Sequence, residues 1–195
     1  MQISIEMGRN GLILAISGFA VATLLDPLVG DRYYSLLPQP ALASAAIVEI
    51  AQTTANELLV EVNRLLDEGW QQMKSGQYQA AIASYEDAIA SARNIGAQQQ
   101  EAEALMGIGV VDSLLNSHQQ AIASRKQAFS IYQSLGQLNG AASAQQGIGD
   151  SYRALGDYSQ AEAHFRQALS IYQQAGDTAS EQYILSLLEQ LASGQ

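Results

Sequence analysis

The chain repeats itself at a spacing of 40 residues, and this repeat limits its possible folds more than any other feature. The segments GQYQAAIASYEDAI, NSHQQAIASRKQAF and GDYSQAEAHFRQAL begin at residues 76, 116 and 156 and align without gaps. Small residues recur in register with them, at Gly69, Gly109 and Gly149; Ala81, Ala121 and Ala161; Ala88, Ala128 and Ala168; and Gly96, Gly136 and Gly176. A period of this length indicates a supersecondary unit that buries its apolar face by stacking on copies of itself.

Each unit is predicted to contain two helices. Beyond Pro40 the chain has no proline and is rich in Ala and Gln, which favour helix. Glycine or asparagine often follows a helix because it adopts a left-handed backbone at low cost, and such a residue occurs twice in every unit. The predicted helices lie at 56–75, 78–95, 97–115, 118–135, 137–155 and 158–175, with a capping helix at about 178–192.

The pattern therefore predicts an all-α repeat domain over residues 62–195. Its repeats are expected at about 62–101, 102–141 and 142–181, preceded by an N-terminal helix or linker at 44–61. A glycine inside a helix costs about 1 kcal/mol relative to alanine, so three at one register need a packing reason. We expect Gly69, Gly109 and Gly149 to allow close approach of each unit's second helix. Tyr85 and Phe165 would fill the space between units, and Arg125 departs from this pattern.

The third unit resembles the tetratricopeptide repeat. The resemblance rests on Ile148-Gly149 with Tyr152, on Ala161, Phe165 and Ala168, and on the turn Gly156-Asp157-Tyr158. It covers roughly 56–192, and the period is similar to that of the longer-helix variant found in kinesin light chain and many bacterial proteins. It implies a right-handed α-solenoid of three helix-turn-helix repeats plus a C-terminal capping helix. It also implies a role in protein–protein interaction.

In this family the first helix of each repeat lines a concave face where partners bind. Carried over by register, that groove here consists of Leu66, Trp70, Met73, Met106, Val110, Leu114, Gln146, Asp150 and Arg153. Its first two thirds are apolar and its end is polar, which favours an amphipathic helix or an apolar peptide as the partner. Two alternatives remain open: residues 44–62 fold back onto the groove, or the groove buries against its copy in a two-fold dimer.

Composition and motifs argue against most other functions. The net charge of -10, with no cluster of Lys and Arg, argues against nucleic-acid binding. The chain has no cysteine, and its two histidines, His118 and His164, have no acidic or histidine neighbours at metal-ligand spacing. No nucleophile motif or phosphate-binding loop occurs. The sequence thus predicts a non-catalytic protein without cofactor or metal.

The first 43 residues have features of a targeting segment. Residues 11–25, GLILAISGFAVATLL, are uncharged and apolar. As a helix they would span about 22 Å, which is shorter than a bilayer core and nearer to a signal-peptide core. Ala41 and Ala43 provide the small residues of a cleavage site, so export to a periplasm-like or lumenal space after cleavage near Ala43 is one expectation.

Two other interpretations of this segment remain open. Residues 11–29 could stay as a signal anchor, in which case the chain resembles membrane-tethered repeat proteins that assist assembly of photosynthetic complexes. Alternatively, the apolar run could form a buried helix of a soluble protein.

Overall fold

The computed structural model describes residues 3–8, 11–16, 19–20 and 40–194, and side-chain environments from residue 52 onward. The chain divides into two compact units, Met1–Ala51 and Gln52–Gln195. Among the described helices, none combines the length and the hydropathy needed to cross a bilayer.

The N-terminal unit contains a small antiparallel sheet. Strands β1 (Ile3–Gly8), β2 (Gly11–Ile16) and β3 (Phe19–Ala20) pair in the order β1-β2-β3, with Ile3 opposite Ile16. Residues 11–25 were considered as a helix in the sequence analysis, but Gly11–Ile16 forms strand β2. The reason lies in the partner segment ISIEMG, where apolar and polar residues alternate with the two-residue period of a strand. The possible cleavage site at Ala41 and Ala43 lies at the start of a helix, and residues 21–39 lie outside the described ranges.

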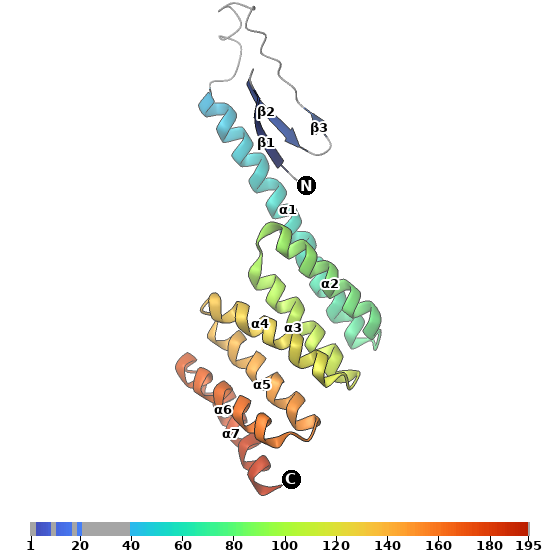
Figure 1. Cartoon of the computed structure of the whole chain (residues 1–195), viewed down its shortest axis with the longest axis vertical. Coiled ribbons are helices and arrows are strands. Elements are labelled where there is room, and N and C mark those ends of the chain that lie inside the picture. The colour runs from blue at the N-terminus through green and yellow to red at the C-terminus, as the bar shows by residue number, and fades with distance from the viewer. Residues whose placement is uncertain (1–2, 9–10, 17–18, 21–39, 195) are drawn as a thin grey trace, which may run out of the picture. The chain divides into compact units, whose positions relative to one another are not determined.

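The described helices have the positions that the repeat predicted, as Figure 1 shows, with one difference at the start. They are α1 (Pro40–Lys74), α2 (Tyr78–Ile95), α3 (Gln98–Leu114), α4 (His118–Ser134), α5 (Leu138–Ala154), α6 (Tyr158–Ala175) and α7 (Thr178–Ser193). Residues 44–61 continue without a break into the first repeat helix, because no glycine or proline interrupts the chain between Pro40 and that helix. The all-α solenoid is thus confirmed for the repeat region.

Left-handed residues separate the helices as predicted. The φ angles of Gly76, Gly96, Gly136, Gly156 and Gly176 are 67–78°, and Asn116 adopts the same region at 58°. At the first of these turns, Gln77 N–H donates to the Gln72 carbonyl oxygen at 2.8 Å and Gly76 N–H donates to that of Met73 at 3.0 Å. This is the Schellman arrangement, which satisfies carbonyl groups at a helix end.

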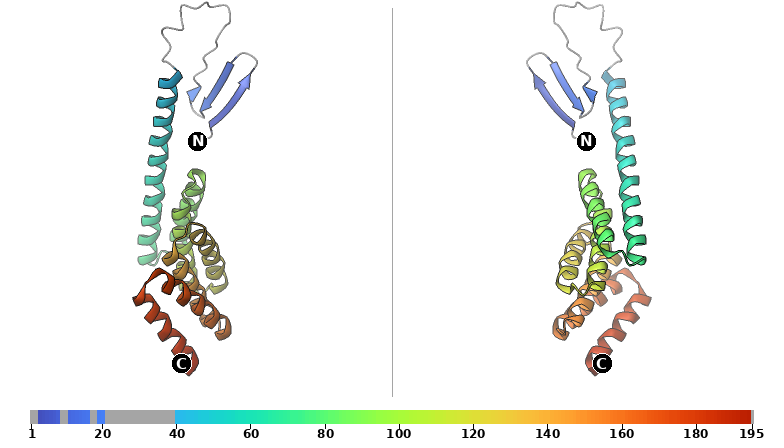
Figure 2. Two further views of the ribbon diagram at one scale, coloured as in Figure 1. Left: turned by 90° about the vertical axis from the view of Figure 1, so that its left-hand side faces the viewer. Right: turned by 90° about the vertical axis from the view of Figure 1, so that its right-hand side faces the viewer.

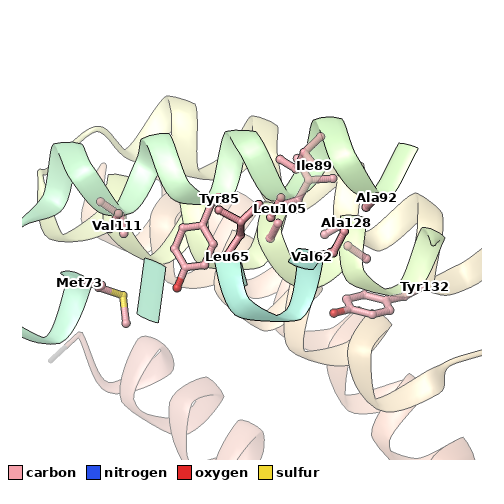
Figure 3. Packing of buried hydrophobic residues seen from close by; sticks show 14 of the residues in the cluster. Val62, Leu65, Met73, Tyr85, Ile89, Ala92, Leu105, Val111, Ala128 and Tyr132 are labelled. Carbon is pink, nitrogen blue, oxygen red and sulfur yellow. The ribbon is translucent and has the colours of Figure 1, made fainter. Parts of the chain in front are cut away.

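The helices stack in chain order from α2 to α7, as the two views in Figure 2 also show. Each of the six alanines at the two repeated positions is fully buried: Ala81, Ala88, Ala121, Ala128, Ala161 and Ala168. Larger side chains fill the space between them. In Figure 3, for example, Tyr85 lies among Leu65, Leu105 and Val111.

The mid-helix glycines allow close approach, as expected. A Cβ atom on Gly69 would lie 2.8 Å from the Tyr85 ring, and one on Gly149 would lie 2.6 Å from Phe165. Gly107 has no explanation in the sequence pattern, but the structure provides one, because a Cβ atom there would lie 2.5 Å from the Tyr85 ring. Each large side chain is thus held between a glycine of its own repeat and a residue of the next first helix, which sets the spacing of α1, α3 and α5.

The two ends of the solenoid break this pattern with carboxylates. Asp67 occupies the register of Gly107 on α1, and Glu189 occupies the register of Gly149 on α7. Both are exposed, so no ring packs over either position. Polar outer faces on terminal repeats are what an α-solenoid needs for solubility. They identify α7 as a capping helix, in agreement with the sequence prediction.

Candidate functional site

The outward side chains of α1, α3 and α5 form the surface that we call the first-helix strip. Its apolar members have large exposed fractions: 50% for Trp70, 36% for Val110 and 51% for Leu114. Trp70 and Val110 occupy the same register in successive repeats, and Leu114 follows Val110 by one helical turn. Leu66 and Met106 are half-buried and pack against the main apolar cluster. The part of the strip on α1 and α3 is therefore apolar, and Leu66 and Met106 form its half-buried base.

Met73 differs from the other predicted members. Its side chain is only 9% exposed and belongs to the buried cluster that also contains Tyr85 and Val111. Helical spacing placed it three residues after Trp70, where the side of the helix turns inward toward the core. We therefore describe Met73 as a core residue and leave it out of the first-helix strip.

The other end of the strip is polar, as the sequence predicted. Gln146, Asp150 and Arg153 are all half-buried on α5. Arg153 Nη2 donates to the Asp150 carboxylate at 3.0 Å, an i,i+3 pair on one face of the helix. Burial raises the pKa of the Asp150 carboxyl, and the charges of Arg153 and Arg125 oppose this effect. The two side chains therefore neutralise each other where a partner would meet them.

A buried cation lies near this polar end. Arg125 on α4 is 6% exposed, and its Nη1 donates to the Gly147 carbonyl oxygen at 2.8 Å and to Ser151 Oγ at 2.7 Å. Burial lowers its pKa, while the charges of Asp150 and Asp112 raise it. These polar partners explain how arginine can occupy a position that holds an aromatic residue in the other two repeats. The sequence alone shows this difference but does not explain it.

The strip has one further member that sequence reasoning missed. Tyr183 on α7 is 50% exposed and occupies the register of Asn63, Glu103 and Ser143. The signal was available, since extending the spacing of 40 residues from Ser143 leads directly to Tyr183. The sequence prediction assigns α7 only a capping role and so leaves Tyr183 out. The surface therefore continues from α1 to α7.

The segment before the first repeat does not cover this surface in the described residues. Residues 52–61 extend the same helix as Leu66 and Trp70, and a straight helix cannot fold back onto its own side. Most of them are exposed, with Val60 at 69%. The alternative in which residues 44–62 fill the groove therefore does not apply to this part of the segment.

A metal site would need clustered His, Cys, Asp or Glu side chains. From residue 52 onward we find no group of three His, Cys, Asp or Glu side chains that could hold a metal ion. His164 stacks on Tyr152 with ring centroids 5.3 Å apart, and its Nδ1 lies 2.7 Å from Gln145 Oε1. A structural role thus accounts for this histidine. His118 begins α4, and its buried Nδ1 has no hydrogen-bond partner in the described residues.

Two cavities lie apart from the first-helix strip. One of about 480 Å³ is lined by residues near the α4–α5 turn, including Gln137 and Asn139. Another of about 300 Å³ lies among α2, α3 and α4, with Ile89 and Ile108 in its wall. Neither cavity includes a residue of the first-helix strip.

Comparison with protein families gives the same assignment as the geometry. Two tetratricopeptide-repeat profiles match the chain, one at residues 100–174 and one at residues 69–95. The chain carries tetratricopeptide repeats. No curated protein sequence matches it.

Solved structures share the fold. The tetratricopeptide-repeat domain of Arabidopsis FLU is 19% identical, with a TM-score of 0.56 over 60% of this chain and 98% of that one. The Rap conjugation regulator of plasmid pLS20, in complex with the Phr* peptide, is 23% identical with a TM-score of 0.60, over 73% of this chain and 40% of that one. The Yersinia enterocolitica type III secretion translocator chaperone SycD, in an alternative dimer, is 13% identical with a TM-score of 0.58, over 69% and 93%.

Proposed function

We propose that the chain is a non-catalytic interaction scaffold that binds a peptide or an amphipathic helix of another protein on the first-helix strip. The observation that carries the proposal is the exposure of Trp70, in register with Val110 and close to the turn that holds Leu114. Contiguous apolar surface of this kind marks interaction sites, and tryptophan is over-represented among the residues that dominate binding energy. Helix-in-groove recognition uses such a row of anchors.

The solved structures agree with this proposal at the level of the fold. Solved structures with a similar fold include a regulator in complex with a peptide and a secretion chaperone. A shared fold does not identify a partner, so the segment that this chain binds must be inferred from its own strip residues.

Two matched valines test the site. Val110 lies on the strip, whereas Val60 is exposed on α1 outside it. We would select ligands for the full chain from a displayed library of 20-residue amphipathic peptides, then measure their binding to Val110→Lys and Val60→Lys. The first variant should lose at least about tenfold in affinity, since one desolvated anchor contributes more than about 1 kcal/mol, and the second should lose little. Equal losses with helix content unchanged would contradict the proposed site.

Self-association is the second candidate, because the same apolar strip could bury against its copy and a solved structure with this fold forms a dimer. Sedimentation of the full chain across a range of concentrations distinguishes the candidates. A dimer that Val110→Lys converts to a monomer supports self-association, and a monomer at every concentration contradicts it.

We also propose export. The apolar residues 11–25 and the small residues Ala41 and Ala43 support a cleaved signal segment, and retention of residues 11–29 as an anchor is the alternative. An anchored chain would fit a role in assembling a membrane complex, such as a photosynthetic one. Sequencing the mature amino terminus tests this proposal: a start after Ala43 supports cleavage, and a start at Met1 contradicts it.

A further inference from the structure

The junction between α4 and α5, which lie side by side in Figure 1, is held by apolar packing near the Gly136 turn that joins them. The Tyr132 ring packs so closely on α5 that a Cβ atom on Gly140 would lie 2.7 Å from it. Tyr132 and Ala141 belong to one buried apolar cluster, against which Ile171 of α6 also packs. Separating the helices at this turn end would expose apolar surface to water, which costs free energy.

A hydrogen bond between repeats adds to the hold at the turn end. Gln137, the residue directly before α5, donates from Nε2 to Gln99 Oε1 on α3 at 2.9 Å. The starts of α3 and α5 are therefore connected directly, as well as through the packing of α4.

The far end of the same junction depends on a buried cation. Arg125 lies about two turns before Tyr132 on α4, and its Nη1 donates to the Gly147 carbonyl oxygen at 2.8 Å and to Ser151 Oγ at 2.7 Å. Its Nε atom is buried and has no hydrogen-bond partner within residues 52–194. Water that entered here would replace both hydrogen bonds and reach Nε, so opening the far end would recover hydration that burial removes.

Two further polar groups on this side of the second repeat are buried. Asp112 of α3 is 8% exposed, and burial raises the pKa of its carboxyl while the charge of Arg125 opposes this effect. His118 begins α4, and its buried Nδ1 finds no hydrogen-bond partner in the part of the chain that the structure describes. Both groups would gain from contact with water.

The junction between α2 and α3 provides an internal comparison. There Tyr85 occupies the register of Arg125, and a Cβ atom on Gly107 would lie 2.5 Å from its ring. Opening that junction would expose an aromatic ring, and water would compensate for nothing. The two junctions thus share one geometry but differ in the cost of opening.

We propose that the solenoid has a hinge between α4 and α5. Helices α5, α6 and α7 rotate as one unit about the contact of Tyr132 with Gly140, while the far end, held by Arg125, opens and closes. Hinges of this kind lie where packed elements meet and absorb motion at a few residues. The proposal follows from packing within the chain and does not depend on the proposed function.

The first-helix strip crosses this hinge. Its members Val110 and Leu114 lie in the C-terminal half of α3, and Asp150 and Arg153 lie in the C-terminal half of α5. These halves are on the side of the far end, so the rotation changes the distance between the apolar and the polar part of the strip. A strip of variable width accommodates segments of different thickness, and a bound segment selects one width.

Spin labels test the hinge directly, because the chain has no cysteine and labels can be attached at chosen positions. Leu114→Cys with Ala154→Cys spans the far end of the second junction at two exposed positions of one register. Lys74→Cys with Leu114→Cys spans the same place in the first junction, and Gln98→Cys with Leu138→Cys spans the turn end. Continuous-wave and pulsed electron paramagnetic resonance of the full chain would give the distribution of label distances for each pair.

We expect the distribution for Leu114 with Ala154 to be roughly twice as wide as that for either other pair, as for a hinge that samples several angles. Arg125→Tyr should narrow it to the width found at the first junction. Arg166→Tyr, which replaces an exposed arginine on α6, is the matched control and should leave it unchanged.

Equal widths for the three pairs would overturn the hinge, and this comparison needs no core variant, so it stands even where Arg125→Tyr does not fold. A wide distribution that a folded Arg125→Tyr leaves unchanged would overturn the role of Arg125. Narrowing by Arg166→Tyr as well would show that the width does not report on the junction, and would also count against the proposal.

Discussion

The guanidinium group of Arg125 lies against the next repeat, where its Nη1 donates a hydrogen bond to the Gly147 carbonyl oxygen at 2.8 Å. A Cβ atom on Gly147 would lie 2.6 Å from Arg125 Nε, so only glycine allows this approach. The buried Nε has no hydrogen-bond partner in the described residues. The apolar core also divides at this level, with one cluster ending at Ala141 and another beginning at Ala142. A single charged side chain thus marks the junction between the second and third repeats.

Replacing Arg125 by tyrosine should leave the free energy of unfolding unchanged or raise it by up to about 3 kcal/mol. Tyr85 shows that an aromatic ring fits between two such glycines, and exchanging buried ionic groups for apolar ones of similar size is often neutral or stabilising. Urea unfolding of Arg125→Tyr at pH 7 measures this. A clear loss of stability would mean that attraction to Asp112 and Asp150 outweighs the cost of burying the guanidinium.

The reverse change, Tyr85→Arg, is the control. Around Tyr85, the positions that correspond to Asp112 and Asp150 are occupied by Gln72 and Val110. One repeat before Val110, the same register holds Trp70. No carboxylate is available at those positions to balance the charge. We expect a loss of about 3–5 kcal/mol in the same urea experiment, as for an uncompensated buried charge.

Gly107 and Asp67 share a register and should respond differently to alanine. A Cβ atom on Gly107 would lie 2.5 Å from Tyr85 Cζ, whereas Asp67 is exposed at the open end of the solenoid. Gly107→Ala should therefore lower the free energy of unfolding by about 1–3 kcal/mol despite the better helix propensity of alanine. Asp67→Ala should change it by less than about 0.5 kcal/mol. Similar values for both in chemical denaturation would show that the ring moves aside without cost.

The sequence was enough to predict the solenoid because its signals are local and repeated. Gly76 and Asn116 end helices through their own backbone conformation, and the buried Ala81 and Ala88 recur in every unit. Helix boundaries after the first turn were predicted to within one residue. The start of α1 was not, because nothing in residues 44–61 distinguishes a linker from a helix that continues into the repeat.

The candidate site was harder to predict because exposure depends on packing between repeats. Trp70 and Met73 look alike in a list of apolar positions on one helix, yet one is half-exposed and the other is buried. The role of Gly107 is evident only from the position of the Tyr85 ring across the repeat junction, and the repeat register alone does not predict that position. Asp67 marks an end of the stack only once it is known that no ring packs against it.

Met73 and Trp70 should separate stability from binding. Met73→Ala would leave a cavity in the main apolar cluster, and we expect a loss of about 2–4 kcal/mol in the free energy of unfolding. Trp70→Ala removes a half-exposed ring, so stability should fall by about 1 kcal/mol or less while affinity for a selected peptide falls at least about tenfold. Chemical unfolding and peptide titration by calorimetry measure the two effects. Equal stability losses would place Trp70 in the core with Met73.

His164 should make the solenoid sensitive to mild acid. Burial, and secondarily the charge of Lys126, lower the pKa of His164 below its ordinary value of 6.5. Protons therefore bind more readily to the unfolded chain, so the stability from this group is present above pH 6.5 and is lost as the pH falls through the lower folded value. Thermal unfolding from pH 7.5 to 5 should show a decrease in Tm, and His164→Gln should reduce that decrease. An identical pH profile for the variant would mean that other groups cause the acid sensitivity.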